Sequence, residues 1–296
     1  MAIFAVVRKI MLRVSVAAIA MLGGRSLVHA QGSSEPLTIL PKSAAAPDPT
    51  TAPLPDSTQP PSGTDWGKGT DLAIEASGEH WTGFEGYRRS VSLYSGLTWS
   101  PFTNLRQDGL RLRAISGQSI YSYSGGRYDL ASNSTVWQQF FGQGRFIDAL
   151  AGWQFSGGGT TAKVFAGYGY VSNIITPYDP ETRIQGTARG AKVVGEVWHN
   201  WNSTVYSSLD VSVAQAHRAY SAQARTGWRF DLGDGPAWSF GPEIGQIGHT
   251  ETTVSRAGLF VRYESVDFEF TIVGGAARTA NDSPMGYGSA QYLKRF

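Results

Sequence analysis

The chain has 296 residues, of which 25 are basic and 23 acidic, so its net charge at pH 7 is only +2. The chain also has no run of basic residues. Its charge therefore gives no electrostatic reason to predict nucleic-acid binding. The absence of cysteine excludes disulfides, thiolate metal sites and the lipoprotein anchor that some exported proteins carry at their signal-peptide cleavage site.

The first thirty residues have the pattern of a secretory signal peptide. Arg8, Lys9 and Arg13 form a basic start, residues 14–22 form a short apolar run, and the segment ends at Ala30 after Val-His. This order predicts cleavage after Ala30.

Two alternatives stay open for this region. Translation could begin at Met11, which would give a more ordinary signal length. The segment could also be a membrane anchor, although its apolar run is far shorter than the roughly twenty residues that a spanning helix needs.

Residues 31–65 contain eight of the fourteen prolines. Such a segment has too few large apolar groups to offset the entropy cost of ordering it, which predicts a disordered periplasmic linker. A proline-rich docking arm for a partner is the alternative.

Residues 66–296 have a different composition, with all nine tryptophans and 32 of the 36 glycines. In residues 91–99, Val91, Leu93 and Leu97 alternate with polar or small residues, which is the period of a β-strand. Many such runs reach about ten residues, the length with which a tilted strand crosses a bilayer. The pattern predicts an all-β fold, a transmembrane antiparallel up-and-down β-barrel.

The alternation predicts about twelve strands, within a range of ten to fourteen, and bacterial single-chain barrels have an even number. The predicted strands are 70–78, 89–100, 109–124, 144–156, 160–172, 187–200, 203–217, 218–232, 237–249, 254–265, 266–276 and 286–296. Residues 135–141 are either a further strand or a hairpin arm above the membrane. Pro242 follows Gly241 and predicts a bulge, because proline removes a ladder donor.

The gaps between these strands predict an orientation. Segments 157–159, 200–202 and 233–236 are short and would be periplasmic turns, whereas 79–88, 125–143, 173–186 and 277–285 would be external loops.

The phase of the alternation predicts which side chains face lipid. Trp228 and Phe230 share one face, while Arg225 and Arg229 occupy the other. A charge facing lipid at mid-depth costs about 2–4 kcal/mol, so the apolar set must face outward. A soluble sandwich or lipocalin-like barrel would bury that set instead; the signal peptide, strand length, absent cysteine and aromatic strand ends favour the membrane barrel.

Charged residues on the predicted inner face have both signs. They are Glu75, Arg111, Arg113, Lys163, Lys192, Glu196, Asp210, Arg225, Arg229, Glu243, Arg262 and Glu264. One interpretation is an ion-pair network that partly plugs the lumen. The other is a polar pore lining for a neutral, hydroxyl-rich polymer or solute, and mixed charge argues against strong ion selectivity.

Five aromatic residues also fall on the inner face and are candidates for stacking against a glucan. They are Tyr94, Tyr121, Tyr123, Trp198 and Tyr206. The alternative places them in the interfacial girdles at the strand ends, and Trp198 and Trp201 flank a turn as girdle residues do.

The loop 172–187 could fold into the pore mouth or contact an external partner. Its carboxylates Asp179 and Glu181 are too few for a hard-cation site.

The sequence predicts no catalytic or metal centre and no cofactor. The histidines after the signal are His80, His199, His217 and His249, and none has the spacing that puts a histidine and a serine on one face of a strand. Neither a G-x-S-x-G elbow nor an H-E-x-x-H motif occurs. The protein is therefore predicted not to be an enzyme.

The carboxyl-terminal Phe296 resembles the signal by which outer-membrane proteins reach the barrel-assembly machinery. Lys294 departs from that pattern, so the match is partial.

Several sequence blocks resemble the cellulose biosynthesis protein BcsS family of Gram-negative bacteria. The blocks are YSGLTWSPF at 94–102, DGLRLR at 108–113, ITPYDP at 175–180, GAKVVGEVW at 190–198, GPEIG at 241–245 and RAGLFVRY at 256–263. The resemblance covers residues 68–296 and implies an outer-membrane protein of cellulose production, with no catalytic residue to carry over.

Three functions stay open. The first is a non-enzymatic barrel that assists export or surface placement of cellulose, with outer-membrane lipid, cellulose and other cellulose-synthesis components as partners. The second is a general small-solute porin or a closed structural barrel. The third is a lipid-modifying enzyme.

Overall fold

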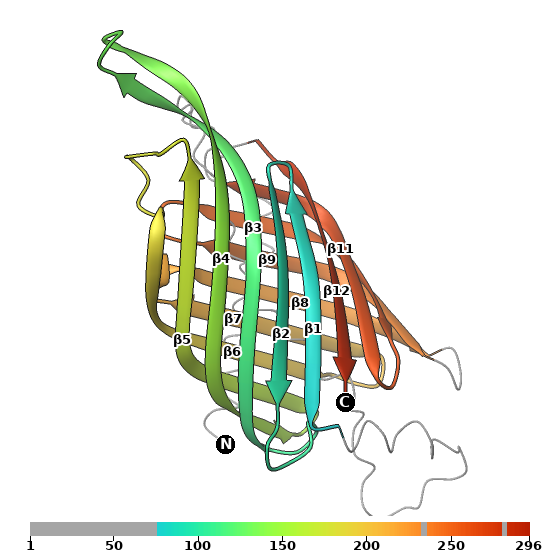
Figure 1. Cartoon of the computed structure of the whole chain (residues 1–296). Coiled ribbons are helices and arrows are strands. Elements are labelled where there is room, and N and C mark those ends of the chain that lie inside the picture. The colour runs from blue at the N-terminus through green and yellow to red at the C-terminus, as the bar shows by residue number, and fades with distance from the viewer. Residues whose placement is uncertain (1–75, 232–235, 280–282) are drawn as a thin grey trace, which may run out of the picture. The chain divides into compact units, whose positions relative to one another are not determined.

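The computed structural model describes residues 76–231, 236–279 and 283–296. The predicted signal peptide, the predicted linker and Glu75 lie outside the described residues. The described part contains a closed β-barrel in which every strand is antiparallel to its neighbours (Figure 1).

The barrel has twelve strands within the described residues, which confirms the predicted number and architecture. They are β1 (Gly78–Tyr87), β2 (Ser90–Trp99), β3 (Gly109–Asp129), β4 (Ser134–Gly157), β5 (Thr160–Thr176), β6 (Gly186–Asn200), β7 (Val205–Ala214), β8 (Tyr220–Asp231), β9 (Ala237–Gly248), β10 (Thr253–Glu264), β11 (Phe268–Thr279) and β12 (Met285–Arg295). Each strand pairs with the next, and β1 pairs with β12 to close the ring. A short 3-10 helix, η1 (Ala216–Arg218), lies between β7 and β8.

The first strand is not where the sequence pattern placed it. The segment 79–88, predicted to be an external loop, forms most of β1, which pairs with β2 from Gly78 to Tyr87. Glycines and charged residues interrupt the apolar alternation here, so the pattern looked like a loop. Pairing on both sides, with β2 and β12, makes the segment a strand.

The predicted bulge at Pro242 is wrong. The pairing of β9 with β10 runs through Pro242 without an extra residue. On the other side, the pairs between β8 and β9 resume in the same register after a gap at Gly241 and Pro242. A Cβ atom on Gly241 would lie 1.8 Å from the carbonyl oxygen of Thr226, so glycine accommodates the close approach without a shift of register.

The strands β3 and β4 extend far beyond their neighbours (Figure 1). The pairing of β2 with β3 ends at Tyr121, and that of β4 with β5 ends at Phe141. Beyond these points β3 and β4 pair only with each other, up to the pair Asp129 and Ser134. Residues 122–141, called the arm below, are therefore a two-stranded hairpin, which decides the alternative left open for residues 135–141.

The arm defines the two ends of the barrel. The arm end also carries the loop 177–185, η1 and the turn 249–252, whereas the described chain begins and ends at the opposite, terminal end (Figure 1). The predicted contrast in loop length holds only in part, because the turn between β1 and β2 at the arm end is short and the turn 100–108 at the terminal end is long.

The outward face of the barrel is apolar. Large side chains such as Leu93, Ile147, Leu259 and Ile272 are exposed, and each is next to at least one buried residue in its strand. A water-soluble protein would not leave a continuous belt of this kind uncovered, whereas acyl chains solvate it. The barrel is therefore a transmembrane β-barrel with its apolar face toward lipid.

Among the described residues, no helix has both the length and the apolar character to span a membrane.

Changing the exposed Leu259, in the middle of β10, to arginine should destabilise the folded barrel by about 2–4 kcal/mol, because the charge would face acyl chains at mid-depth. The matched variant Ser255→Arg, on the same face but near the strand end, should cost at most about 1 kcal/mol. Urea unfolding in lipid vesicles would measure both. Equal losses at the two depths would contradict the lipid-facing assignment.

Candidate functional site

The inner face of the barrel collects charged side chains of both signs. Apart from Glu75, every charged residue predicted to face inward is buried or nearly buried: Arg111, Arg113, Lys163, Lys192, Glu196, Asp210, Arg225, Arg229, Glu243, Arg262 and Glu264. Burying a charge is costly unless it is paired, so the partners of these groups decide what the interior can do.

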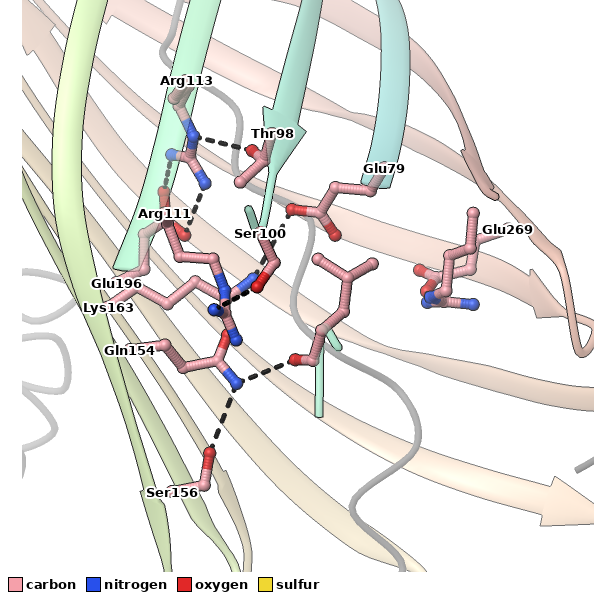
Figure 2. A network of polar contacts seen from close by, with 12 residues as sticks. Glu79, Thr98, Ser100, Arg111, Arg113, Gln154, Ser156, Lys163, Glu196 and Glu269 are labelled. Atoms are coloured by element: carbon pink, nitrogen blue, oxygen red, sulfur yellow. Dashed lines mark hydrogen bonds and ion pairs between the residues drawn. The ribbon is translucent and has the colours of Figure 1, made fainter. Parts of the chain in front are cut away.

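One ion pair joins two walls of the barrel near the terminal end (Figure 2). Arg113 on β3 pairs with Glu196 on β6 and donates a hydrogen bond to the Thr98 hydroxyl at 3.0 Å. Its guanidinium lies 3.8 Å from the ring centre of Phe165 and 5.1 Å from that of Trp81. Because β4 and β5 separate β3 from β6 in the sheet, this contact crosses the interior.

A second ion pair crosses the same region. Lys163 on β5 lies 3.5 Å from Glu79 on β1, and three strands lie between them around the ring (Figure 2). Both side chains are buried. Together with the Arg113–Glu196 pair, it ties β1, β3, β5 and β6 to one another through their side chains.

Arg111 organises the long turn at the terminal end. Its guanidinium donates to the carbonyl oxygens of Asn104, Gln107 and Leu110 and to the hydroxyls of Ser100 and Thr103. Gln154 on β4 donates to the carbonyl of Leu105 at 2.8 Å, and the Leu105 side chain is buried. The turn 100–108 is therefore fastened to the inner wall by its polar contacts.

A carboxylate-centred cluster lies nearer the arm end. Arg256 on β10 lies 2.7 Å from Glu85 on β1 and 3.4 Å from Glu243 on β9. Glu243 also lies 2.6 Å from Arg225 on β8 and accepts a hydrogen bond from the Tyr287 hydroxyl of β12 at 3.3 Å. One glutamate thus connects β8, β9, β10 and β12, and the Arg256–Glu85 pair extends the connection to β1.

Further pairs complete the interior. Glu269 accepts from both Arg262 and Arg295. Lys192 lies 2.6 Å from Asp148, and Arg229 lies 3.8 Å from Glu264.

A cavity of about 40 Å³ lies beside the Lys192–Asp148 pair and is also lined by Phe146, Tyr220 and Ile247. Such a volume accommodates roughly one or two water molecules but no sugar ring.

The candidate glucan-stacking aromatics are all buried and packed against other groups. Trp198 stacks on Tyr206 with 4.0 Å between ring centres, and Arg262 lies over Trp198 at 5.1 Å. The girdle interpretation is therefore wrong for Trp198, which is 2% exposed, whereas Trp201 is exposed. Tyr94 belongs to the interior cluster that includes Trp81.

Of the two remaining candidates, Tyr121 lies at the base of the arm and Tyr123 lies on its inner face. Their rings are stacked, and Tyr123 also stacks on Phe140. Ile184, from the loop 177–185, packs into the same cluster.

The loop 177–185 is fastened at both of its sides. Asp179 accepts hydrogen bonds from the Tyr123 hydroxyl at 2.6 Å and from Arg127 at 2.6 and 2.8 Å. Glu251, in the turn between β9 and β10, accepts from the Thr182 hydroxyl at 2.9 Å and from the Arg183 amide. The loop therefore links the arm to a distant turn at the arm end of the barrel.

The electrostatics of Asp179 follow from these contacts. Partial burial raises its pKa, but the hydrogen bonds from Arg127 and Tyr123 outweigh it, so the pKa of Asp179 lies below its usual value. The carboxylate is therefore ionised at neutral pH.

Six buried charged groups escaped the sequence prediction: Glu79, Glu85, Asp148, Arg256, Glu269 and Arg295. Glu79 and Glu85 lie in the segment taken for a loop. The other four alternate with outward residues, as Glu269 does between Phe268 and Phe270, so strand phase alone could have found them.

The structure brings together one histidine and one serine whose contact the sequence spacing did not predict. His80 on β1 lies 2.9 Å from the Ser95 hydroxyl on β2, on the outward face. Ser95 also donates to the Trp81 carbonyl at 3.2 Å, and the residue opposite His80 on β12 is Lys294. In the described residues no carboxylate orients this histidine, so the pair lacks the third group of a catalytic triad.

Within the described ranges, no group of three or more histidine, aspartate or glutamate side chains could hold a metal ion.

A protein-family model described as "Cellulose biosynthesis protein BcsS" matches residues 80–296, which confirms the resemblance seen in the sequence blocks. A comparison with curated proteins gives no match.

Solved structures of barrel proteins are similar over most of the described chain. The β domain of the Bordetella autotransporter BrkA has a TM-score of 0.47 and 13% identity, covering 75% of this chain and 99% of its own. LpxR from Salmonella typhimurium has a TM-score of 0.42 and 11% identity, covering 74% of this chain and 100% of its own. The KdgM porin in complex with disordered oligogalacturonate has a TM-score of 0.40 and 7% identity, covering 74% of this chain and 99% of its own. At these scores no functional argument rests on them.

Replacing Glu196 with alanine should destabilise the barrel by about 3–5 kcal/mol, because it leaves the buried Arg113 charge unpaired. The double variant Arg113→Met with Glu196→Met should lose much less. The matched control Glu181→Ala removes the exposed partner of another ion pair and should cost at most about 1 kcal/mol. Urea unfolding of the four proteins measures the coupling. A loss for Glu196→Ala no larger than the control would contradict a buried pair.

The Asp179 contacts should hold the loop 177–185 at neutral pH and release it in acid. The pKa of Asp179 in the folded protein lies below its value of about 3.9 in the unfolded chain. The stabilisation from its ionised carboxylate is therefore complete above about pH 3.9 and is lost as the pH falls through the folded-state pKa. Hydrogen exchange of the loop amides, corrected for intrinsic rates, should show equal protection at about pH 7 and pH 5. Asp179→Asn should lose protection at both, whereas the control Glu181→Gln should keep it. Wild-type loss near neutral pH would contradict this assignment.

Proposed function

Because this chain belongs to the cellulose biosynthesis protein BcsS family, we propose that it is a non-enzymatic outer-membrane barrel that assists surface placement of the glucan. The arm end then faces the cell exterior and both barrel termini face the periplasm, as in bacterial outer-membrane barrels.

One observation favours surface placement of the glucan over its passage through a wide pore. The pairs Arg113–Glu196, Lys163–Glu79 and Arg256–Glu85 join strands that are not neighbours, so side chains cross the lumen. A polymer passing through would have to break each pair and leave its charges unpaired, at a cost of several kcal/mol for each. The inner wall therefore favours a closed lumen, with the glucan handled at the arm end.

The runner-up is export or solute passage through a lumen that opens. It would depend on movement of the turn 100–108, which Arg111 and Gln154 hold against the inner wall by hydrogen bonds. Displacement of this turn would widen the terminal end of the barrel.

A lipid-modifying activity is supported least. His80 and Ser95 lie on the outward face, but they lack an orienting carboxylate among the described residues. Loss of a lipid hydrolase or deacylase activity on Ser95→Ala would overturn the non-enzymatic proposal.

A strain in which the chromosomal gene is deleted should retain less dye-binding cellulose at the cell surface, while synthase activity in membrane preparations stays unchanged. Complementation with the full chain should restore the surface signal. Undiminished surface cellulose in the deletion strain would overturn the proposed function.

Planar-bilayer recordings distinguish the closed barrel from the porin alternative. The purified protein should show little steady conductance, and Glu79→Gln combined with Glu196→Gln should raise it by loosening both cross-wall pairs. A large steady conductance of the unmodified protein would instead support a general porin.

A further inference from the structure

The arm has two faces with different surroundings. On its inner face, Tyr123, Arg127 and Phe140 contact the loop 177–185 or one another. Its outer face carries Tyr128 and Trp137, which are 59% and 62% exposed. Eight or so residue pairs beyond the barrel rim, at about 3.3 Å per residue, would carry the tip roughly 25 Å past the neighbouring strands. The outer face thus presents two exposed aromatic rings away from the membrane belt.

The two exposed rings share one face of the hairpin. Tyr128 pairs with Thr135, and Trp137 pairs with Gly126, so the rings occupy diagonal positions in successive pairs of that face. Opposite Trp137 the partner strand has no side chain, and nothing from that position covers the indole. Two-stranded hairpins are marginal in isolation, and exposed rings of this size mark an interaction surface.

The chemistry of this surface is neutral. Residues 130–141 contain no charged side chain. The carboxylate of Asp129 accepts hydrogen bonds from the Ala131 and Ser132 amides and from the Ser132 hydroxyl. Arg127 is paired with Asp179 and Glu181. Asp129 keeps its negative charge, but by strand alternation it lies on the same face as Arg127. The outer face itself therefore has no charged side chain with which to select an anionic or cationic partner.

Neutral hydrogen-bonding groups flank the exposed indole. Thr135 and Gln139 stand two residues on either side of Trp137 and share its face by strand alternation. A hydroxyl and an amide can both donate and accept. Rings bordered by such groups suit a glucose chain, which offers C–H faces for stacking and hydroxyls for hydrogen bonding.

We propose that the outer face of the arm, centred on Trp137 and Tyr128, is a binding surface for a single chain of cellulose outside the membrane. This inference rests on the proposed function and deepens it by naming the surface that holds the glucan. The chain lies across the hairpin and stacks on the two rings, while Thr135 and Gln139 contact its hydroxyls.

Calorimetric titration of the full chain in detergent micelles with cellohexaose tests the surface directly. Tyr128→Ala combined with Trp137→Ala should weaken binding roughly tenfold or more, as expected from the loss of two stacking contacts. The matched control Phe102→Ala removes an exposed aromatic residue at the terminal end and should leave binding unchanged. Maltohexaose, with the same glucose units in another linkage, should bind more weakly than cellohexaose.

Heat-modifiable migration on gels establishes that each variant keeps a folded barrel. Unchanged cellohexaose binding by the folded double variant would overturn the proposal. So would a double variant that loses only lipopolysaccharide binding, or one that changes only the oligomeric state, since these outcomes assign the surface to a lipid or to a second copy.

The test separates this inference from the proposed function. Surface cellulose that is unaffected by deletion, together with arm-dependent cellohexaose binding, overturns only the proposed function. Reduced surface cellulose on deletion, together with full binding by the double variant, overturns only the arm surface.

Discussion

The structure depends on one constraint, the cost of placing a charge in hydrocarbon. Along the spanning strands, apolar side chains such as Leu259 and Ile272 face outward, and charged ones such as Arg113 and Glu243 face inward. The inward charges are themselves away from bulk water, so each needs a partner. The resulting pairs, such as Arg113–Glu196, join walls that the backbone ladder does not connect, so the constraint that orients the strands also places ion pairs across the interior.

The loops at the two ends of the barrel are also held by side-chain contacts. At the terminal end, the turn 100–108 is held by Arg111. At the arm end, the loop 177–185 is fastened by Asp179 to the arm and by Glu251 to the turn between β9 and β10. The inner face of the arm is held by contacts with the loop 177–185, whereas Tyr128 and Trp137 on its outer face are exposed. Under the proposed function, such a barrel would anchor in the membrane a surface that holds the glucan outside it.

The alternation of side chains predicted the fold and the inward-facing charges well, because a two-residue period is a local property of each strand. It failed at β1, where Gly83, Gly86 and the buried Glu79 and Glu85 break the apolar rhythm. It failed at Pro242, where a close backbone approach by Gly241 replaced the predicted bulge. For Trp198, position beside a turn suggested a lipid-facing girdle, whereas strand phase correctly put the ring inside.

By itself, the sequence determined the class of barrel, the face toward lipid and a strand number of about twelve, because alternation is a local property of each strand. The family resemblance rested on the order of several blocks along the chain. Tertiary structure alone decided which charges pair, that β3 and β4 continue as an arm, and that His80 meets Ser95. Those contacts join residues far apart in sequence, such as Arg113 and Glu196, and depend on strand register and on the closure of β1 against β12. Register is a property of pairs of strands, so no single strand's pattern contains it.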